Sequence, residues 1–160
     1  MAGCGAAGQS KNREAVLAAM SAPFRFDGSA ALEGVSQPIG FSVTKTKDGL
    51  LVELSEPTAV SGLTVEFGES GTRVTYHGLV MSLSEGDIPS ESLFAYLREV
   101  LGTVPQVSQW SETEGQITLC GKAGMLPCEL MWSADEIILQ AIRLPSVGGV
   151  ILVENFEKIL

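Results

Sequence analysis

Two cysteines and their spacing offer the most specific chemistry in this chain. Cys120 and Cys128 flank residues 121–124, a glycine-rich stretch that predicts a tight turn between two strands. A hairpin could hold the two thiols opposite each other, at about the 5.5 Å Cα separation that a disulfide requires. Such a bond would persist outside the cytoplasm. The alternative is two buried free cysteines that behave as small apolar residues, and the sequence leaves both interpretations open.

Catalytic and metal-binding patterns are weak in comparison. His77 is the one histidine and has no partner marked by spacing, so we interpret it as a residue in a turn. Residues 68–71 do not match the Gly-x-Ser-x-Gly nucleophile motif, and residues 148–149 predict a turn rather than a phosphate loop. The acidic pairs within 112–114 and 135–136 are typical of solvated turns. We therefore expect no enzyme activity, no metal and no cofactor.

A third cysteine lies near the N-terminus and suggests lipid chemistry. Ala2, Gly3 and Cys4 look like the end of a bacterial lipobox, after which the cysteine carries a diacylglycerol. The small and polar residues that follow suggest a flexible tether, so residues 1–12 are predicted to be lipobox remnant and tether. This predicts an extracytoplasmic protein that partners a membrane through Cys4. The alternative is an ordinary cytosolic N-terminus with a chance cysteine.

Composition limits the remaining choices of class and partner. The chain has 160 residues, of which 45% are hydrophobic, and this predicts one folded domain over residues 13–160. No apolar run approaches the roughly 20 residues that span a bilayer, so membrane attachment would have to come from the lipid. A net charge of −9 argues against nucleic acid as a partner.

Two helices are predicted to position this chemistry. The first runs from Ser10, its N-cap, to about residue 20, with Val16, Leu17 and Met20 at helical spacing. The second opens near Ser90 and ends at Gly102. Its apolar stripe consists of Leu93, Phe94, Leu97, Val100 and Leu101.

Period-two alternation predicts that the rest of the domain is strands joined by turns. Predicted strands cover 41–44, 50–54, 63–67, 73–76, 105–112, 115–121, 126–132, 136–144 and 149–156, and turns fall at 47–49, 69–71 and 85–87. The fold class is therefore mainly β, with one curved antiparallel sheet of about 9–11 strands. Two helices cannot cover so large a sheet completely. Either the sheet curls on itself, or part of its apolar face stays open as a groove.

Three stretches of the chain resemble the LolA/LolB-like superfamily of lipoprotein carriers. Residues 53–65 look like its strand, Pro-containing corner and following strand, and residues 74–89 are similar to its middle section. Residues 115–138 and 150–156 look like its closing strands. The resemblance implies an unclosed β half-barrel with two helices on its concave side, over a hydrophobic cavity. With Cys4, it implies a lipidated envelope lipoprotein of the Gram-positive type.

Two functions follow as hypotheses. The first is a membrane-anchored lipoprotein that binds a lipid or other hydrophobic ligand in the cavity of the half-barrel. The alternative is a protein-interaction or envelope-sensor lipoprotein with a filled core, no ligand and an envelope protein as its partner. The candidate cavity residues are Leu63, Val65, Phe67, Tyr76, Met81, Phe94, Trp110 and Trp132.

Overall fold

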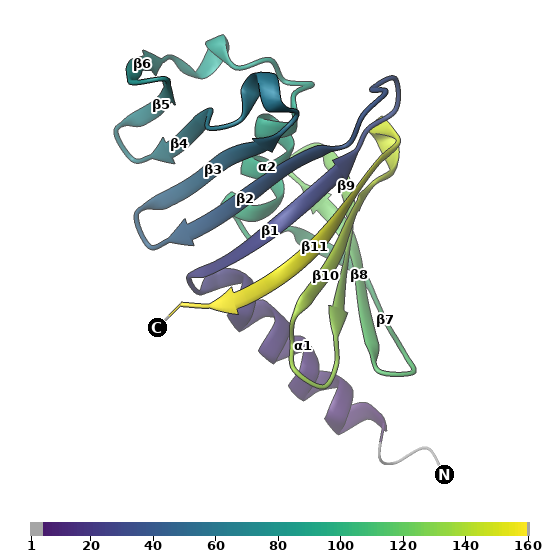
Figure 1. Cartoon of the computed structure of the whole chain (residues 1–160). Coiled ribbons are helices and arrows are strands. Elements are labelled where there is room, and N and C mark those ends of the chain that lie inside the picture. Colours follow the sequence, from purple (N-terminus) through teal and green to yellow (C-terminus); the bar gives the residue numbers. More distant parts are fainter. Residues whose placement is uncertain (1–4, 160) are drawn as a thin grey trace.

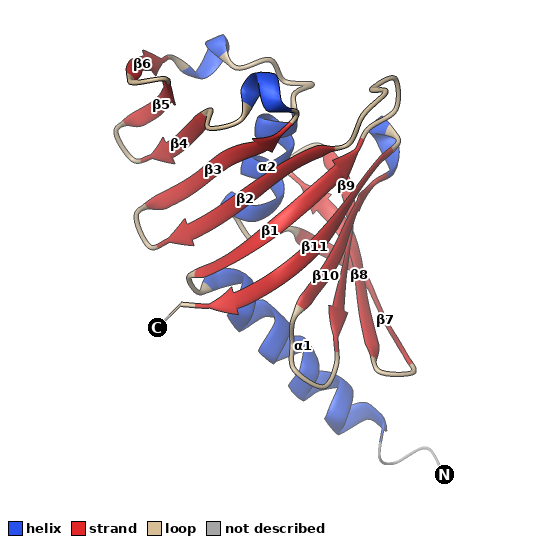
Figure 2. Cartoon of the chain, viewed as in Figure 1, coloured by secondary structure: helices blue, strands red, loops and turns tan. Residues whose placement is uncertain are grey.

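The computed structural model describes residues 5–159, so Cys4 lies outside the described residues. It forms a single unclosed sheet that curves around a helix, with a second helix along one end (Figure 1, Figure 2). The main elements are α1 (Gly5–Ser21), β1 (Phe24–Ala31), β2 (Ile39–Thr46), β3 (Gly49–Glu56), β4 (Thr64–Gly68), β5 (Gly71–Tyr76), β6 (Leu79–Leu83), α2 (Leu93–Gly102), β7 (Gln106–Thr113), β8 (Gln116–Ala123), β9 (Leu126–Ser133), β10 (Leu139–Leu144) and β11 (Gly149–Lys158).

The sheet consists of two meanders joined at their first and last strands. Its 11 strands lie in the order β6-β5-β4-β3-β2-β1-β11-β10-β9-β8-β7, and every pair is antiparallel. Strands β1 to β6 follow one another from the middle of the sheet to one edge, and α2 then crosses the concave side (Figure 1). Strands β7 to β11 follow one another from the opposite edge back to the middle. The predicted fold class, including the strand number, is confirmed.

Helix α1 is longer than the sequence predicted. It begins at Gly5, so residues that we interpreted as tether are helical. Small residues suggested flexibility, but alanine is also the strongest helix former. Val16, Ala19 and Met20 are buried against the sheet. Leu17 was predicted to share this face, but it is 37% exposed.

Helix α2 fills the concave side of the half-barrel. Ser92 is its N-cap, since the Ser92 hydroxyl accepts a hydrogen bond of 3.2 Å from the Ala95 N–H. The helix ends at Gly102, as predicted, although it starts three residues after Ser90. Its buried residues are Leu93, Ala95, Tyr96, Leu97, Val100 and Leu101.

Aromatic side chains from distant strands form the centre of the core. Phe24 stacks on Phe156 with ring centroids 5.4 Å apart, and Trp132 meets Phe156 edge-on at 5.7 Å. Phe26 meets Phe41 edge-on at 6.4 Å. These rings come from β1, β2, β9 and β11, so the cluster packs the junction of the two meanders.

Most predicted strands and turns lie where the alternation placed them. The exceptions carry weak signals. Strand β1 alternates phenylalanine with glycine and alanine on its inner face, and β6 has apolar residues on both faces. The last residues gave no clear prediction and continue β11 as far as Lys158.

Within residues 5–159, no helix is both long enough and apolar enough to span a bilayer.

A prediction follows from the contact between Phe41 and Gly28. A Cβ atom added at position 28 would lie 2.5 Å from Cζ of Phe41, because the ring packs directly on the β1 backbone. We expect Gly28→Ala to lower the free energy of unfolding by about 1–3 kcal/mol, measured by urea denaturation. Gly86→Ala is the matched control, since a Cβ at position 86 meets nothing within 4 Å. Equal stability of the two variants would contradict the packing described.

Candidate functional site

A cleft opens at one end of the half-barrel, beside the C-terminal ends of both helices. Its volume is about 660 Å³, which lies within the range of small-molecule sites. It is bounded by the β2–β3 and β4–β5 turns, the last turn of α2 and the residues that follow α2. We call it the mouth cleft. Its apolar lining is provided by Leu50, Phe67 and Val104.

Both signs of charge surround this apolar lining. Lys45, Lys47 and Arg98 supply three cations, and Asp48, Glu69 and Glu99 supply three anions. Arg98 lies over the Phe67 ring with 5.5 Å from its Cζ to the centroid, and its Nη2 is 3.9 Å from Glu99 Oε1. The cleft is therefore amphipathic, and its local charge is balanced although the chain carries a net charge of −9.

Lys45 has a structural role within the cleft. Its ammonium donates a hydrogen bond of 2.6 Å to the carbonyl of Met20, in the last turn of α1. A cation at this position satisfies a terminal carbonyl and complements the negative end of the helix dipole. Burial lowers the pKa of Lys45 below its usual value. Lys45 therefore holds α1 in place, and Lys47 and Arg98 are the cations better placed to meet a ligand.

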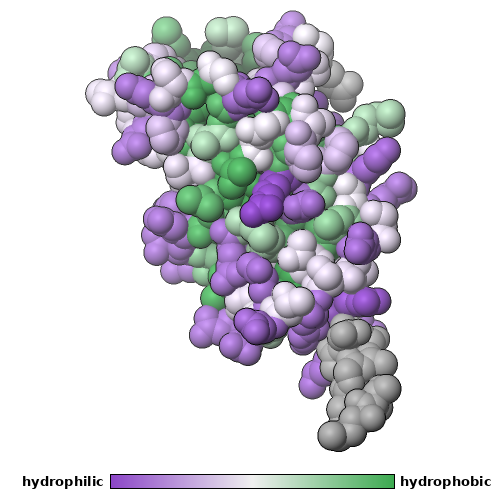
Figure 3. Space-filling model, turned by 90° about the vertical axis from the view of Figure 1, so that its right-hand side faces the viewer, coloured by the Kyte–Doolittle hydropathy of each residue, from purple (hydrophilic) through white to green (hydrophobic). Residues whose placement is uncertain are grey.

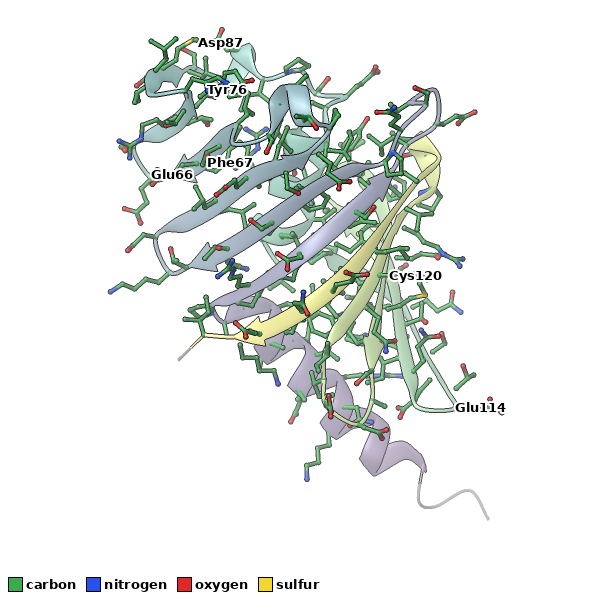
Figure 4. The ribbon with its side chains drawn as sticks, viewed as in Figure 1. Glu66, Phe67, Tyr76, Asp87, Glu114 and Cys120 are labelled. Carbon is green, nitrogen blue, oxygen red and sulfur yellow. The ribbon has the colours of Figure 1, made fainter. Side chains whose placement is uncertain are left out.

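The predicted cavity residues do not share one cavity. Phe67 lines the mouth cleft, and Figure 4 shows it on β4 next to Glu66, which points to the opposite face. Trp110 lines a separate hollow of about 110 Å³ beneath Arg13 of α1. Met81 lies on β6 and is 61% exposed. Val65 and Trp132 belong to the core, and Leu63 and Phe94 pack against it. Tyr76 is half-buried on β5, where its hydroxyl donates a hydrogen bond to the carbonyl of Ala59.

The interior of the half-barrel is filled where a ligand cavity was expected. Trp132 is 1% exposed, and its indole N–H has no hydrogen-bond partner among the described residues. The cavity beside it measures about 10 Å³ and is lined by residues of α1, α2, β1, β9 and β10. That space is too small for an acyl chain, because ligand sites usually measure about 300–1,000 Å³. The mouth cleft has no local signature in the sequence, because its lining is brought together from two turns and two helix ends.

Of the two interpretations that the sequence left open, the structure has the free thiols, with Cys120 half-buried and Cys128 buried. Across β8 and β9, Cys120 pairs with Glu129 and Cys128 pairs with Gly121. The register is thus one residue away from the one that a bridge needs, and a shift of one residue moves a side chain to the opposite face. Cys128 points into the core, whereas Cys120 lies on the convex face (Figure 4).

Neither thiol is activated as a nucleophile, because the environment disfavours both thiolates. Burial raises the pKa of Cys120, and the carboxylate of Glu129 raises it further. Burial raises the pKa of Cys128 to about 11. Both residues therefore have a structural role and not a nucleophilic one.

Most of the other reactive side chains lie in turns, as the sequence indicated, but Glu112 lies on β7 and accepts a hydrogen bond from Asn12. His77 and Gly78 form the two-residue turn between β5 and β6, with φ of 49° and 80°. Glu114 lies at the tip of the β7–β8 hairpin (Figure 4). Residues 148–149 lie between the short helix after β10 and the start of β11. Within residues 5–159, no group of three or more histidine, cysteine, aspartate and glutamate side chains could hold a metal ion.

Comparison with known proteins identifies relatives of the fold only. No protein-family model matches the chain, and a search of curated proteins finds no match. A structure of an uncharacterized conserved protein from Thermus thermophilus aligns with 94% of this chain and 87% of its own, at 10% identity and a TM-score of 0.57. A DUF1329 family protein from Desulfovibrio piger aligns over 96% and 92%, at 12% identity and a TM-score of 0.51.

A LolA superfamily protein from Nitrosomonas europaea aligns with 92% of this chain and 93% of its own, at 10% identity and a TM-score of 0.49. The two structures with higher scores share the architecture of this chain across nearly its whole length. The unclosed half-barrel that the LolA/LolB-like resemblance implied is therefore confirmed as the fold.

The cysteine geometry predicts a defined order of alkylation. In a Cys4→Ser background, we expect iodoacetamide to modify Cys120 of the native protein slowly, and faster as the pH rises, since the thiolate is the reactive form. Cys128 is 2% exposed and should be modified only after denaturation. Mass spectrometry of tryptic peptides measures both rates. If neither thiol reacts in denaturant until a reductant is added, the two residues are bridged and the register described is wrong.

Proposed function

We propose that this chain is a non-enzymatic envelope lipoprotein, anchored outside the cytoplasm through Cys4, that binds a hydrophobic or amphiphilic ligand in the mouth cleft. The observation that carries the proposal is the cleft itself. Its volume of about 660 Å³ and its apolar lining suit part of a lipid. Burial of apolar ligand surface contributes about 25 cal/mol per Å².

The balanced charge at the rim favours a neutral or zwitterionic ligand. Three cations and three anions line the cleft, and the C-terminal ends of α1 and α2, which carry partial negative charge, lie beside it. A strongly anionic ligand gains little there. A zwitterionic headgroup can pair with Arg98 on one side and Glu69 on the other while its chain covers Phe67 and Val104.

Because the interior is filled, we do not propose that the half-barrel carries a whole acyl chain inside it. A ligand in the mouth cleft remains partly exposed, because the cleft opens to solvent and the core beyond it is packed by α2. This arrangement suits a protein held at one membrane, where ligand exchanges with the lipid surface. The alternative function, a protein-interaction module without a ligand, draws support from the same filled core.

Ligand binding is tested with a phosphatidylethanolamine that carries a fluorescent acyl chain. We expect Val104→Glu to weaken binding about tenfold or more, because it places a carboxylate in the apolar lining. Val150→Glu is the matched control, since Val150 lies on the convex face and is 37% exposed against 39% for Val104. Fluorescence titration measures both affinities. No binding by the unaltered protein, or equal losses in the two variants, would reject the mouth cleft as a lipid site.

Anchoring is tested separately from ligand binding. The chain is expressed in a bacterium behind a lipoprotein signal peptide and labelled with an alkyne analogue of palmitate. We expect label on the unaltered chain and on the Cys120→Ser control, and none on Cys4→Ser, because diacylglycerol is attached at the cysteine thiol. Label that persists in Cys4→Ser, or its absence from the unaltered chain, would show that Cys4 is not the lipid attachment site.

A further inference from the structure

Among residues 5–159, the sheet has two edge strands, β6 and β7, and β6 carries no charge, proline or bulge that would oppose pairing. Natural edge strands are usually blocked by charges, proline, bulges or a covering element. The residues of β6 are Leu-Val-Met-Ser-Leu, which include no charge and no proline, and its pairing with β5 has no bulge. The opposite edge, β7, has a bulge between Val107 and Gln109 and an acidic residue, Glu112.

Helix α1 also lies against β7. The Asn12 side-chain amide donates a hydrogen bond of 3.0 Å to Glu112, and Arg13 lies 5.6 Å from the Trp110 ring centroid. Figure 3 shows the side of the molecule that lies to the right in Figure 1, and hydrophobic residues lie there between many hydrophilic ones. The same chain thus protects one edge of its sheet and leaves the other open.

The geometry of the β5–β6 hairpin decides which main-chain groups are available. Its two-residue turn has positive φ at both positions, as in a type I′ turn, so Tyr76 and Leu79 form the hydrogen-bonded pair next to it. Hydrogen-bonded pairs alternate along an antiparallel ladder. Val80 and Ser82 therefore direct their N–H and C=O groups away from β5, toward the free edge.

Apolar side chains flank these outward main-chain groups on both faces. Leu79 and Met81 are 76% and 61% exposed and lie on the concave face, beside Tyr76 and Val74 of β5. Val80 is 62% exposed and lies on the convex face. The sheet reaches beyond α2 here (Figure 1), so no helix covers these residues. An added strand would gain main-chain hydrogen bonds and bury apolar surface on both faces.

The charges near β6 favour a basic occupant. Asp87 follows β6 and lies near it in Figure 4, and its carboxylate accepts a hydrogen bond of 2.7 Å from the Ser84 N–H. Asp87 forms no ion pair with a described residue, whereas Arg73 on β5 is paired with Glu66 at 3.1 Å. A second copy of this chain would bring two net charges of −9 together. An anionic membrane surface would be repelled for the same reason.

We propose that β6 is a docking edge for an extended, basic segment of a partner protein. The segment adds as a further antiparallel or parallel strand on the main-chain groups of Val80 and Ser82. Its alternate apolar side chains pack on Leu79 and Met81, and a lysine or arginine residue faces Asp87. Such strand addition takes affinity from main-chain hydrogen bonds and specificity from alternate side chains. The docking edge is separate from the mouth cleft and does not depend on a ligand there.

The probe is a nine-residue peptide, Lys-Lys-Val-Thr-Val-Thr-Val-Lys-Lys, added to the full isotope-labelled chain. We expect amide chemical shifts to change in β5 and β6 and amide exchange at Val80 and Ser82 to slow. Ser82→Pro removes one outward N–H and should weaken binding about tenfold, whereas Ser82→Ala keeps it and should bind as the unaltered chain does. Val80→Lys gives a second test without a backbone change, and should also weaken binding. Unchanged shifts in β8–β11 confirm that each variant is folded.

Four results would overturn the proposal. The first is that the amide shifts of β5 and β6 do not respond to the peptide, and the second is that Ser82→Pro and Ser82→Ala bind it with equal affinity. The third is that a peptide with glutamate in place of lysine binds equally well. The fourth is that the chain associates with itself and that Ser82→Pro abolishes this association. The last would make a second copy the occupant. Binding of anionic vesicles that Val80→Lys strengthens, without peptide binding, would assign the edge to a membrane instead.

Discussion

The pairing of β1 with β11 is the constraint on which the rest of the structure depends. It brings together the two ends of the folded domain and turns two separate meanders into one sheet. The register slips beside Asp27, where the side chain of Asn155 donates a hydrogen bond of 3.0 Å to the Asp27 carboxylate across 128 positions of sequence. Asn155 has φ of 53°, a conformation that asparagine tolerates better than most residues. Without this junction each meander would have an additional open edge.

Coverage of the concave face follows from that junction. A sheet of 11 strands has more apolar surface than two helices can bury, so the helices occupy the middle and leave the periphery. Helix α2 packs against β3 and β9, on opposite sides of the junction, and α1 closes one end. Two uncovered places result. One is the mouth cleft, where the helices end, and the other is β6, beyond the reach of α2.

The sequence predicted the composition of the elements better than their relative placement. Alternation located most strands within a few residues, and Gly102 ended α2 as expected. The same method placed Cys120 and Cys128 on one hairpin but could not choose between a bridge and two free thiols, because a slip of one residue in register is invisible to a local pattern and reverses the face of each side chain. Phe67 and Trp132 were both named as cavity residues because they are large and apolar, a property that does not separate a cleft lining from a core.

By itself the sequence determined a mainly β domain with an apolar face too large for its helices, and turns at His77 and at residues 135–136. Those features depend on local periodicity and on residue chemistry, which a single chain displays directly. Only the tertiary structure decided where the surplus apolar surface lies. It filled the interior around Trp132, brought Val104 beside the buried Leu50 and Phe67 at the mouth, and left Leu79, Val80 and Met81 exposed. Such outcomes depend on packing between distant segments, and no local pattern records that packing.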